Sequence, residues 1–239
     1  MIDLVNRRIK VDEIIFLSFK EFFRNIKDIF LITLVFGIPT AIANFMEEKD
    51  VIHDSIFKSY NGGFVSFLTM LFVSIGSMAI IKLVSESIKG NKIGWEKAIR
   101  DTLPKSVSTI IASILGIIII AVFTFLLIIP GIIACIALSL SLQFIVLENS
   151  EALKSLQKSK NLLDGEKWDV FVKLFLLGII ICLIEILITM GMNVLVVSFS
   201  PIIIIGSLIS SLLGQVIVIA TTIIYINLKN LKETYDFIA

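Results

Sequence analysis

Six long apolar runs constrain this 239-residue chain more than any other feature of its sequence. They occupy residues 29–46, 63–84, 107–129, 131–147, 171–196 and 202–227. The hydrocarbon core of a bilayer is about 30 Å thick, and a helix of about 20 apolar residues crosses it. Hydrophobic residues make up 57% of the chain and charged residues 17%, whereas soluble domains average about 45–50% and about 25%. The sequence therefore predicts an all-α, polytopic membrane protein with six transmembrane helices in one membrane domain. It excludes an ordinary soluble enzyme, a disordered chain and a collagen-like chain.

The basic residues are distributed unevenly between these runs. Of the 21 Lys and Arg residues, nineteen lie in the segments 1–28, 82–105, 148–173 and the tail after residue 227. The other two, Lys49 and Lys58, lie in the loop 47–62 beside four acidic residues. Because cytoplasmic loops of membrane proteins are rich in Lys and Arg, we expect a multi-pass protein of the cell membrane with both termini in the cytoplasm.

Three of the basic segments have the apolar periodicity of an amphipathic helix, at residues 10–27, 93–104 and 150–164. Such helices lie in the headgroup layer, with their apolar face inward and their basic side chains toward anionic lipids. Each precedes the first, third or fifth run, so one order of elements occurs three times and predicts three degenerate repeats. The side chains predicted to lie at the membrane surface are Lys20, Arg24, Lys27, Trp95, Lys154, Lys158 and Trp168.

The stretch from Pro130 to Phe171 carries a recognisable motif. Pro130-Gly131-Ile132 precedes an apolar span ending in Val146-Leu147-Glu148, and Ser159-x-x-Leu162-x-x-Gly165-x-x-Trp168 follows. This stretch resembles the membrane domain joined to some glycerophosphodiester phosphodiesterases, and related stand-alone bacterial and archaeal membrane proteins of poorly defined function. The resemblance implies a six-span membrane domain and no enzyme, because the phosphodiesterase activity of such proteins belongs to a separate soluble domain. The sequence departs from these relatives at Ala137 and Gln143, where they often carry arginine and proline.

Polar residues inside the predicted spans mark a candidate site. Glu185 lies near the middle of the fifth run, where a carboxylate is costly and is expected to face the interior of the helix bundle. We expect it to donate a hydrogen bond to a neighbouring span. The remaining members of the candidate site are Thr189 and Asn193 on the face of Glu185, and Gln143, Ser207, Ser211 and Gln215 on other spans. Gln143, Ser207 and Ser211 are the expected acceptors. These seven residues can form a polar cavity for a proton, a cation or a polar headgroup, or they can make hydrogen bonds between helices.

Motifs for catalysis and metal binding are not found in the sequence. It has no P-loop, no Gly-x-Ser-x-Gly and no His-Glu-x-x-His pattern, and its single histidine, His53, lies in a loop. No cofactor, metal or nucleic acid is expected to bind, and the expected partners are membrane lipids, a partner membrane protein or a second copy of the chain.

The leading hypothesis is a non-enzymatic membrane protein that binds or transports an amphipathic or lipid-like molecule. One alternative is a structural or accessory subunit that packs against a partner protein, with Glu185 as a packing hydrogen bond. An ion channel is the third, and the sequence shows no ring of like residues to favour it.

Overall fold

The computed structural model describes residues 7–48, 55–196 and 202–238, and every regular element in these ranges is a helix. The prediction of an all-α fold is confirmed. The elements are α1 (Val11–Arg24), α2 (Ile26–Glu48), α3 (Ser55–Ile88), α4 (Trp95–Thr102), the 3₁₀ turn η1 (Leu103–Lys105), α5 (Ser106–Leu126), α6 (Ile128–Leu138), α7 (Ser141–Glu148), α8 (Ala152–Leu162), α9 (Lys167–Val196) and α10 (Ile202–Ile238). Helices α1, α4 and α8 occupy the three segments with amphipathic periodicity.

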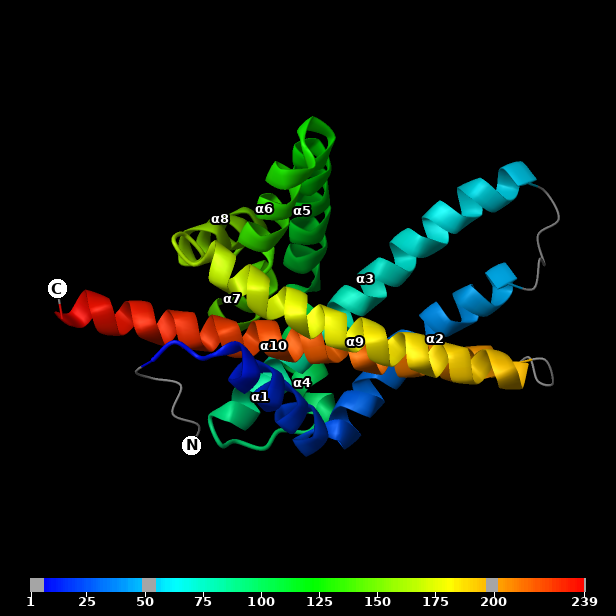
Figure 1. Ribbon diagram of the computed structural model, residues 1–239, viewed down its shortest axis with the longest axis horizontal. Coiled ribbons are helices and arrows are strands. Elements are labelled where there is room, and N and C mark those ends of the chain that lie inside the picture. Colours follow the sequence, from blue (N-terminus) through cyan, green and yellow to red (C-terminus); the bar gives the residue numbers. More distant parts are fainter. Residues whose placement is uncertain (1–6, 49–54, 197–201, 239) are drawn as a thin grey trace.

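Helix α10 is the central element of the packing. It contacts α1, α2, α3 and α9, whereas the α5–α6 hairpin rises away from this group (Figure 1). Ile219 and Ala220 of α10 are fully buried, together with Ile32 of α2 and Leu177 of α9. The apolar core therefore lies around α10, and it gathers helices that are distant in sequence.

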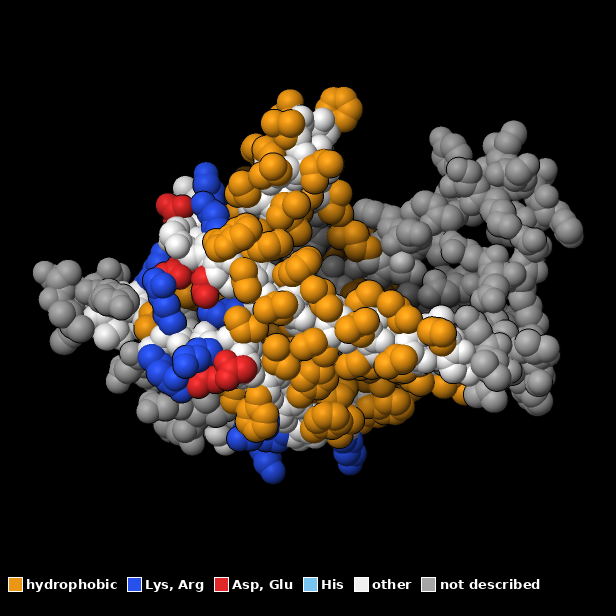
Figure 2. Space-filling model, viewed as in Figure 1, with side chains coloured by type: hydrophobic (Ala, Val, Ile, Leu, Met, Phe, Trp, Pro, Cys, Tyr) orange, Lys and Arg blue, Asp and Glu red, His pale blue; other side chains and the backbone are white. Residues whose placement is uncertain are grey.

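Five stretches are long and apolar enough to cross a membrane: Thr69–Ile88, Trp95–Leu126, Ile128–Glu148, Lys167–Gly191 and Leu208–Thr234. Figure 2 shows apolar side chains over the α5–α6 hairpin and α9, while charged side chains gather on the left of the view, around α8. Phe125, at the tip of the hairpin, is 93% exposed. An exposed apolar surface of this extent is typical of a protein that lies in lipid. A sixth span, at residues 29–46, stays a prediction, because the side chains of α2 beyond Ile38 lie outside the described residues. The threefold repeat also stays a prediction.

The predicted runs 107–129 and 131–147 put the reversal of the chain at residue 130, but the turn between α5 and α6 lies earlier. The chain reverses at Leu127, whose backbone is extended (φ −162°, ψ 141°), and not at Pro130–Gly131. Pro130 lies in the first turn of α6, where the helix does not require its missing N–H. Gly131 permits the tight hairpin, because a Cβ at this position would lie 2.8 Å from the Cα of Thr124.

The helix expected at 131–147 is interrupted, and α6 and α7 are separated by Ser139 and Leu140. Ser159 of α8 closes the interruption with its hydroxyl group. Its Oγ donates to the carbonyl oxygen of Ala137 at 2.7 Å and accepts from the N–H of Leu140 at 3.1 Å. Backbone groups in an apolar layer need protein partners, because lipid offers none. Ser159, the first residue of the Ser159–Trp168 motif, therefore has a structural role.

Ion pairs attach α8 and the N-terminal segment to the long helices. Glu148, at the end of α7, accepts from Lys158 of α8 and from Lys229 of α10, each at 2.7 Å. The hydroxyl of Tyr225 on α10 donates to the same carboxylate at 2.7 Å. Lys158, predicted to lie at the membrane surface, is exposed and also pairs with Glu148, so Glu148 joins α7, α8 and α10.

We expect Gly131→Ala to lower the melting temperature, because the backbone of Thr124 cannot move away from the new methyl group. Overpacking of this kind costs about 1–3 kcal/mol. Gly116→Ala in α5 is the matched control, since a Cβ there meets nothing within 4 Å. Thermal unfolding of both variants in detergent measures the effect. Equal melting temperatures for the two variants would contradict the close approach of α5 and α6.

We expect Ser159→Ala to destabilise the protein by about 1–3 kcal/mol, because it leaves two buried backbone groups without a partner. Ser155→Ala on the same helix is the control. Ser155 is also fully buried, but its hydroxyl bonds only to its own helix, at the carbonyl oxygen of Ala152 (2.7 Å). Chemical or thermal unfolding should show a clearly lower stability for Ser159→Ala than for Ser155→Ala. The reverse order would show that the Ser159 hydroxyl does not stabilise the junction between α6 and α7.

Candidate functional site

A polar pocket lies where the end of α1, the start of α2 and the last turn of α3 meet the loop that leads to α4. Its volume is about 250 Å³. Six of the nine residues that line it are polar or charged, two are apolar and one is glycine. The lining residues are Arg24, Asn25, Asp28, Leu83, Ser87, Gly90, Asn91, Lys92 and Ile93. We call this cavity the α1–α3 pocket.

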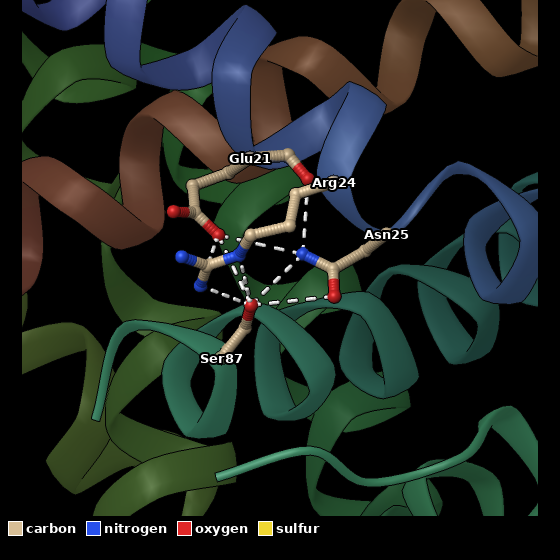
Figure 3. Close-up of polar contacts among 4 residues, drawn as sticks. All are labelled: Glu21, Arg24, Asn25 and Ser87. Atoms are coloured by element: carbon tan, nitrogen blue, oxygen red, sulfur yellow. Dashed lines mark hydrogen bonds and ion pairs between the residues drawn. The ribbon is translucent and has the colours of Figure 1, made fainter. Parts of the chain in front are cut away.

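Four residues form a hydrogen-bonded cluster at one wall of the pocket (Figure 3). Glu21 Oε2 forms an ion pair with Arg24 Nη2 at 2.7 Å and accepts a hydrogen bond from the hydroxyl of Ser87 at 3.1 Å. Ser87 Oγ in turn accepts from Arg24 Nε at 2.9 Å and from Asn25 Nδ2 at 3.0 Å. The cluster therefore connects α1 to the last turn of α3.

Glu21 is the least accessible charged residue of this cluster, since its side chain is fully buried. Its Oε2 has the partners given above, whereas its Oε1 has no hydrogen-bond partner among the described residues. Burial of a carboxylate is costly unless it is paired. The guanidinium of Arg24 therefore compensates the buried carboxylate, and only part of its donor capacity is available to a ligand.

The backbone around the pocket follows from the residues at the helix ends. Asn25 ends α1, its N–H bonding to the carbonyl oxygen of Glu21 at 3.1 Å, and α2 begins at the next residue. Gly90 has φ +90°, a conformation that favours glycine, and it turns the chain out of α3. Asp28 Oδ1 accepts the N–H of Trp95 at 3.1 Å, so the first residue of α4 is fixed to α2. Two short turns and one carboxylate therefore define the mouth of the pocket.

Lys92 and Asn91 extend from the loop at the other wall. Asn91 Nδ2 donates to Glu86 Oε2 at 2.9 Å, which orients its side chain along the end of α3. Lys92 is exposed and makes no ion pair or hydrogen bond within the described part of the chain. Its ammonium group is the cation of the pocket that is available for a ligand.

The described members of the predicted seven-residue site do not come together as one site. Gln143 Nε2 donates to Thr221 Oγ1 at 2.8 Å, which joins α7 to α10. Glu185 is half-buried on α9 and Thr189 is exposed, and neither is bonded to another described residue. The predicted bonds from Glu185 to Gln143 and to Ser211 are therefore not formed. The side chains of Asn193 and Ser207 lie outside the described residues.

Ser211 and Gln215 lie together beside a small cavity between α2, α3 and α10. Thr33 is the third polar residue of its wall, and the volume is about 20 Å³. Thr33 Oγ1 and Gln215 Oε1 are buried and have no hydrogen-bond partner among the described residues. A cavity of this size has room for about one water molecule, and Glu185 is not among the residues that line it.

Most of the predicted surface residues are exposed. Lys20, Lys27, Lys154 and Trp168 are exposed, with Trp168 74% accessible. Arg24 and Lys158 are exposed as well and form ion pairs with Glu21 and Glu148, and Trp95 is half-buried at the start of α4. The sequence analysis missed Glu21, Asn25, Ser87 and Asn91. Of these four residues, only Asn25 had a signal in the sequence. It is a polar residue of low helix propensity between two apolar helical patterns, which is typical of a helix boundary.

Comparison with known proteins adds no relative: no family model, no curated protein and no solved structure matches the chain. The resemblance of residues 130–171 to a phosphodiesterase-associated membrane domain stays a prediction from sequence. Among the described residues, no group of three or more His, Cys, Asp or Glu side chains could hold a metal ion. The class of protein that the fold defines is an all-helical membrane protein, with a polar pocket at the charged end of its helices.

Proposed function

We propose that this membrane protein binds or transports an amphipathic, phosphate-bearing molecule whose polar head occupies the α1–α3 pocket. The observation that carries the proposal is a cavity of about 250 Å³ between the end of α1 and the end of α3, with Arg24 and Lys92 in its wall. Ligand pockets for drug-sized molecules measure about 300–1,000 Å³. The α1–α3 pocket therefore suits the head of an amphiphile better than a complete hydrophobic ligand.

The donors in the pocket favour a phosphate group. Lys92 supplies an ammonium group that has no partner among the described residues. The amide of Asn91 has a second N–H beside the one that it donates to Glu86, whereas the amide of Asn25 already donates to Glu21 and Ser87. Arg24 uses Nε and Nη2 for Ser87 and Glu21, and no bond of its Nη1 to a described residue is found. Arginine and lysine are the residues that most often bind phosphate in proteins, because their bonds to it are charge-assisted.

The neighbouring surface suits the apolar part of the same molecule. Phe23, Ile26 and Phe30 adjoin the pocket residues in sequence and are 63%, 43% and 44% exposed. Exposed apolar side chains beside a polar pocket are what an acyl chain requires. The excess of Lys and Arg in segments on one side of the predicted spans supports a location of the pocket at the cytoplasmic face.

An accessory subunit is the second candidate function. The observation that favours it is the position of Glu185 and Thr189 on α9, where Thr189 is exposed and Leu187 next to it is 70% accessible. Polar groups on a lipid-facing helix are satisfied when another helix covers them.

Lys92→Gln should weaken binding of dihexanoyl phosphatidylglycerol about 3- to 10-fold, because one charge-assisted hydrogen bond is lost. Isothermal titration of the full-length protein in an uncharged detergent measures the dissociation constants. Lys20→Gln is the matched control, since Lys20 is an exposed lysine of α1 that does not line the pocket. Equal losses in both variants would indicate surface electrostatics alone, and unchanged affinity in Lys92→Gln would exclude the pocket as the binding site.

The proposed orientation is tested by accessibility in intact cells. In a Cys135→Ser, Cys182→Ser background, Ser59→Cys should react with a membrane-impermeant maleimide and Lys154→Cys should not. Lys154 is suitable because its side chain is 67% exposed, so protection of the cysteine reports the membrane and not burial in the protein. Labelling of Lys154→Cys without labelling of Ser59→Cys would reverse the topology.

A further inference from the structure

The wall of the α1–α3 pocket carries charges of both signs. Arg24 and Lys92 are its cations, and Asp28 is an acidic residue in the same wall. Arg24 is compensated by the buried carboxylate of Glu21, whose Oε2 lies 2.7 Å from Arg24 Nη2 (Figure 3). With Glu21 counted, two positive and two negative groups surround the cavity, so they have no net charge. A pocket for a simple anion is expected to carry an excess of positive charge, because each carboxylate repels the anion.

Asp28 is the residue that a simple anion leaves without a role in binding. Its Oδ1 accepts the N–H of Trp95 at 3.1 Å, which fixes the start of α4. Its carboxylate forms no ion pair with any cation of the described chain, although Lys92 lines the same cavity. A carboxylate that is partly removed from water is stabilised by a cation or by hydrogen-bond donors. Asp28 Oδ2 is therefore an acceptor that the described part of the fold leaves available to a ligand.

We infer that the head group in the α1–α3 pocket is a zwitterion, whose phosphate binds Lys92 and Arg24 and whose ammonium group binds Asp28. The inference rests on the proposed function and narrows it to phospholipids with a primary amine, of the phosphatidylethanolamine type. Such a head has no net charge, as the groups around the cavity have none. Because the cavity measures only about 250 Å³, a head with a short carbon link between phosphate and ammonium can reach both kinds of side chain.

The charges of such a head each meet their opposite in the pocket. Lys92 approaches from the loop after α3 and Arg24 from the end of α1, so the phosphate has a cation from each of two segments. Asp28 approaches from the first turn of α2. A phosphate without the ammonium group would leave the Asp28 carboxylate facing a like charge. Electrostatic complementarity of this kind determines which ligand is preferred more than how tightly it binds.

The wall also distinguishes between kinds of amine. A primary ammonium group has several N–H donors, and a carboxylate accepts them in charge-assisted hydrogen bonds. A quaternary ammonium group has no N–H, and proteins bind it with aromatic side chains. None of the described residues that line the pocket is aromatic. Asp28 therefore favours phosphatidylethanolamine over phosphatidylcholine.

The preference is measured by isothermal titration of the full-length protein in an uncharged detergent, with dihexanoyl phospholipids that differ only in the head group. Phosphatidylethanolamine should bind about 3- to 10-fold more tightly than phosphatidylglycerol or phosphatidylcholine, because neither of these donates an ammonium N–H to Asp28. High ionic strength limits the attraction of phosphatidylglycerol to the basic surface. Equal affinities for the three lipids, or a preference for phosphatidylcholine, would overturn the inference.

Asp28→Asn separates this contact from other differences between the lipids. The amide keeps an oxygen for the N–H of Trp95 but has no charge, so the preference for phosphatidylethanolamine over phosphatidylglycerol should disappear. Asp101→Asn is the matched control, since Asp101 is an exposed acid of α4 that does not line the pocket, and it should keep the preference. Melting temperatures show whether both variants are folded. A folded Asp28→Asn protein that keeps the preference would exclude Asp28 as the ammonium site.

Glycerophosphoethanolamine, which has the same head but no acyl chains, distinguishes a lipid from a soluble phosphodiester. It should bind more weakly than the dihexanoyl lipid, because it has no chains to contact the exposed Phe23, Ile26 and Phe30. Equal affinity of the two would overturn the lipid as the occupant. Failure of the proposed function is a different result, in which Lys92→Gln leaves the binding of every lipid unchanged. Binding that depends on Lys92 but shows no head-group preference would overturn only the zwitterion.

Discussion

Hydrogen bonds and ion pairs at one end of the helices determine how the amphipathic segments are placed on the long ones. Glu21 is fully buried and is acceptable there only because Arg24 and Ser87 bind its carboxylate. Glu148 performs the equivalent function for α7, α8 and α10 through Lys158 and Lys229. The apolar core around α10 holds the long helices together, and these ion pairs attach the amphipathic segments to it. The α1–α3 pocket forms beside the first of the two clusters.

The apolar runs and the amphipathic periodicity were sufficient to predict the fold class and the position of most helices. Both signals are local, since a window of about 20 residues contains them. The cluster beside the pocket is not local, because Ser87 is 62 residues from Asn25 and 66 residues from Glu21. Glu21 was missed because a charged residue on a basic amphipathic helix is expected to face water. Only the packing of α1 against the long helices shows that it is buried.

The sequence shows which residues inside the apolar runs are polar, but not which of them contact one another. Gln143 and Thr221 pair across α7 and α10, and Gln215 lies beside Thr33 of α2. Which faces of α7, α9 and α10 meet depends on the interruption at Ser139, and neither glycine nor proline marks that position. The Pro130–Gly131 pair was a misleading signal for a turn, because proline is also compatible with the first turn of a helix.

The hydroxyl of Ser159 has a mechanical consequence for the membrane layer. It bonds to the carbonyl oxygen of Ala137 and to the N–H of Leu140, on either side of the interruption between α6 and α7. Helix α8 is therefore attached to the C-terminal end of α6. Any tilt or lateral displacement of α8 therefore acts on the base of the α5–α6 hairpin through these two bonds. A small rotation at the base gives a larger displacement at Phe125, at the tip of the hairpin.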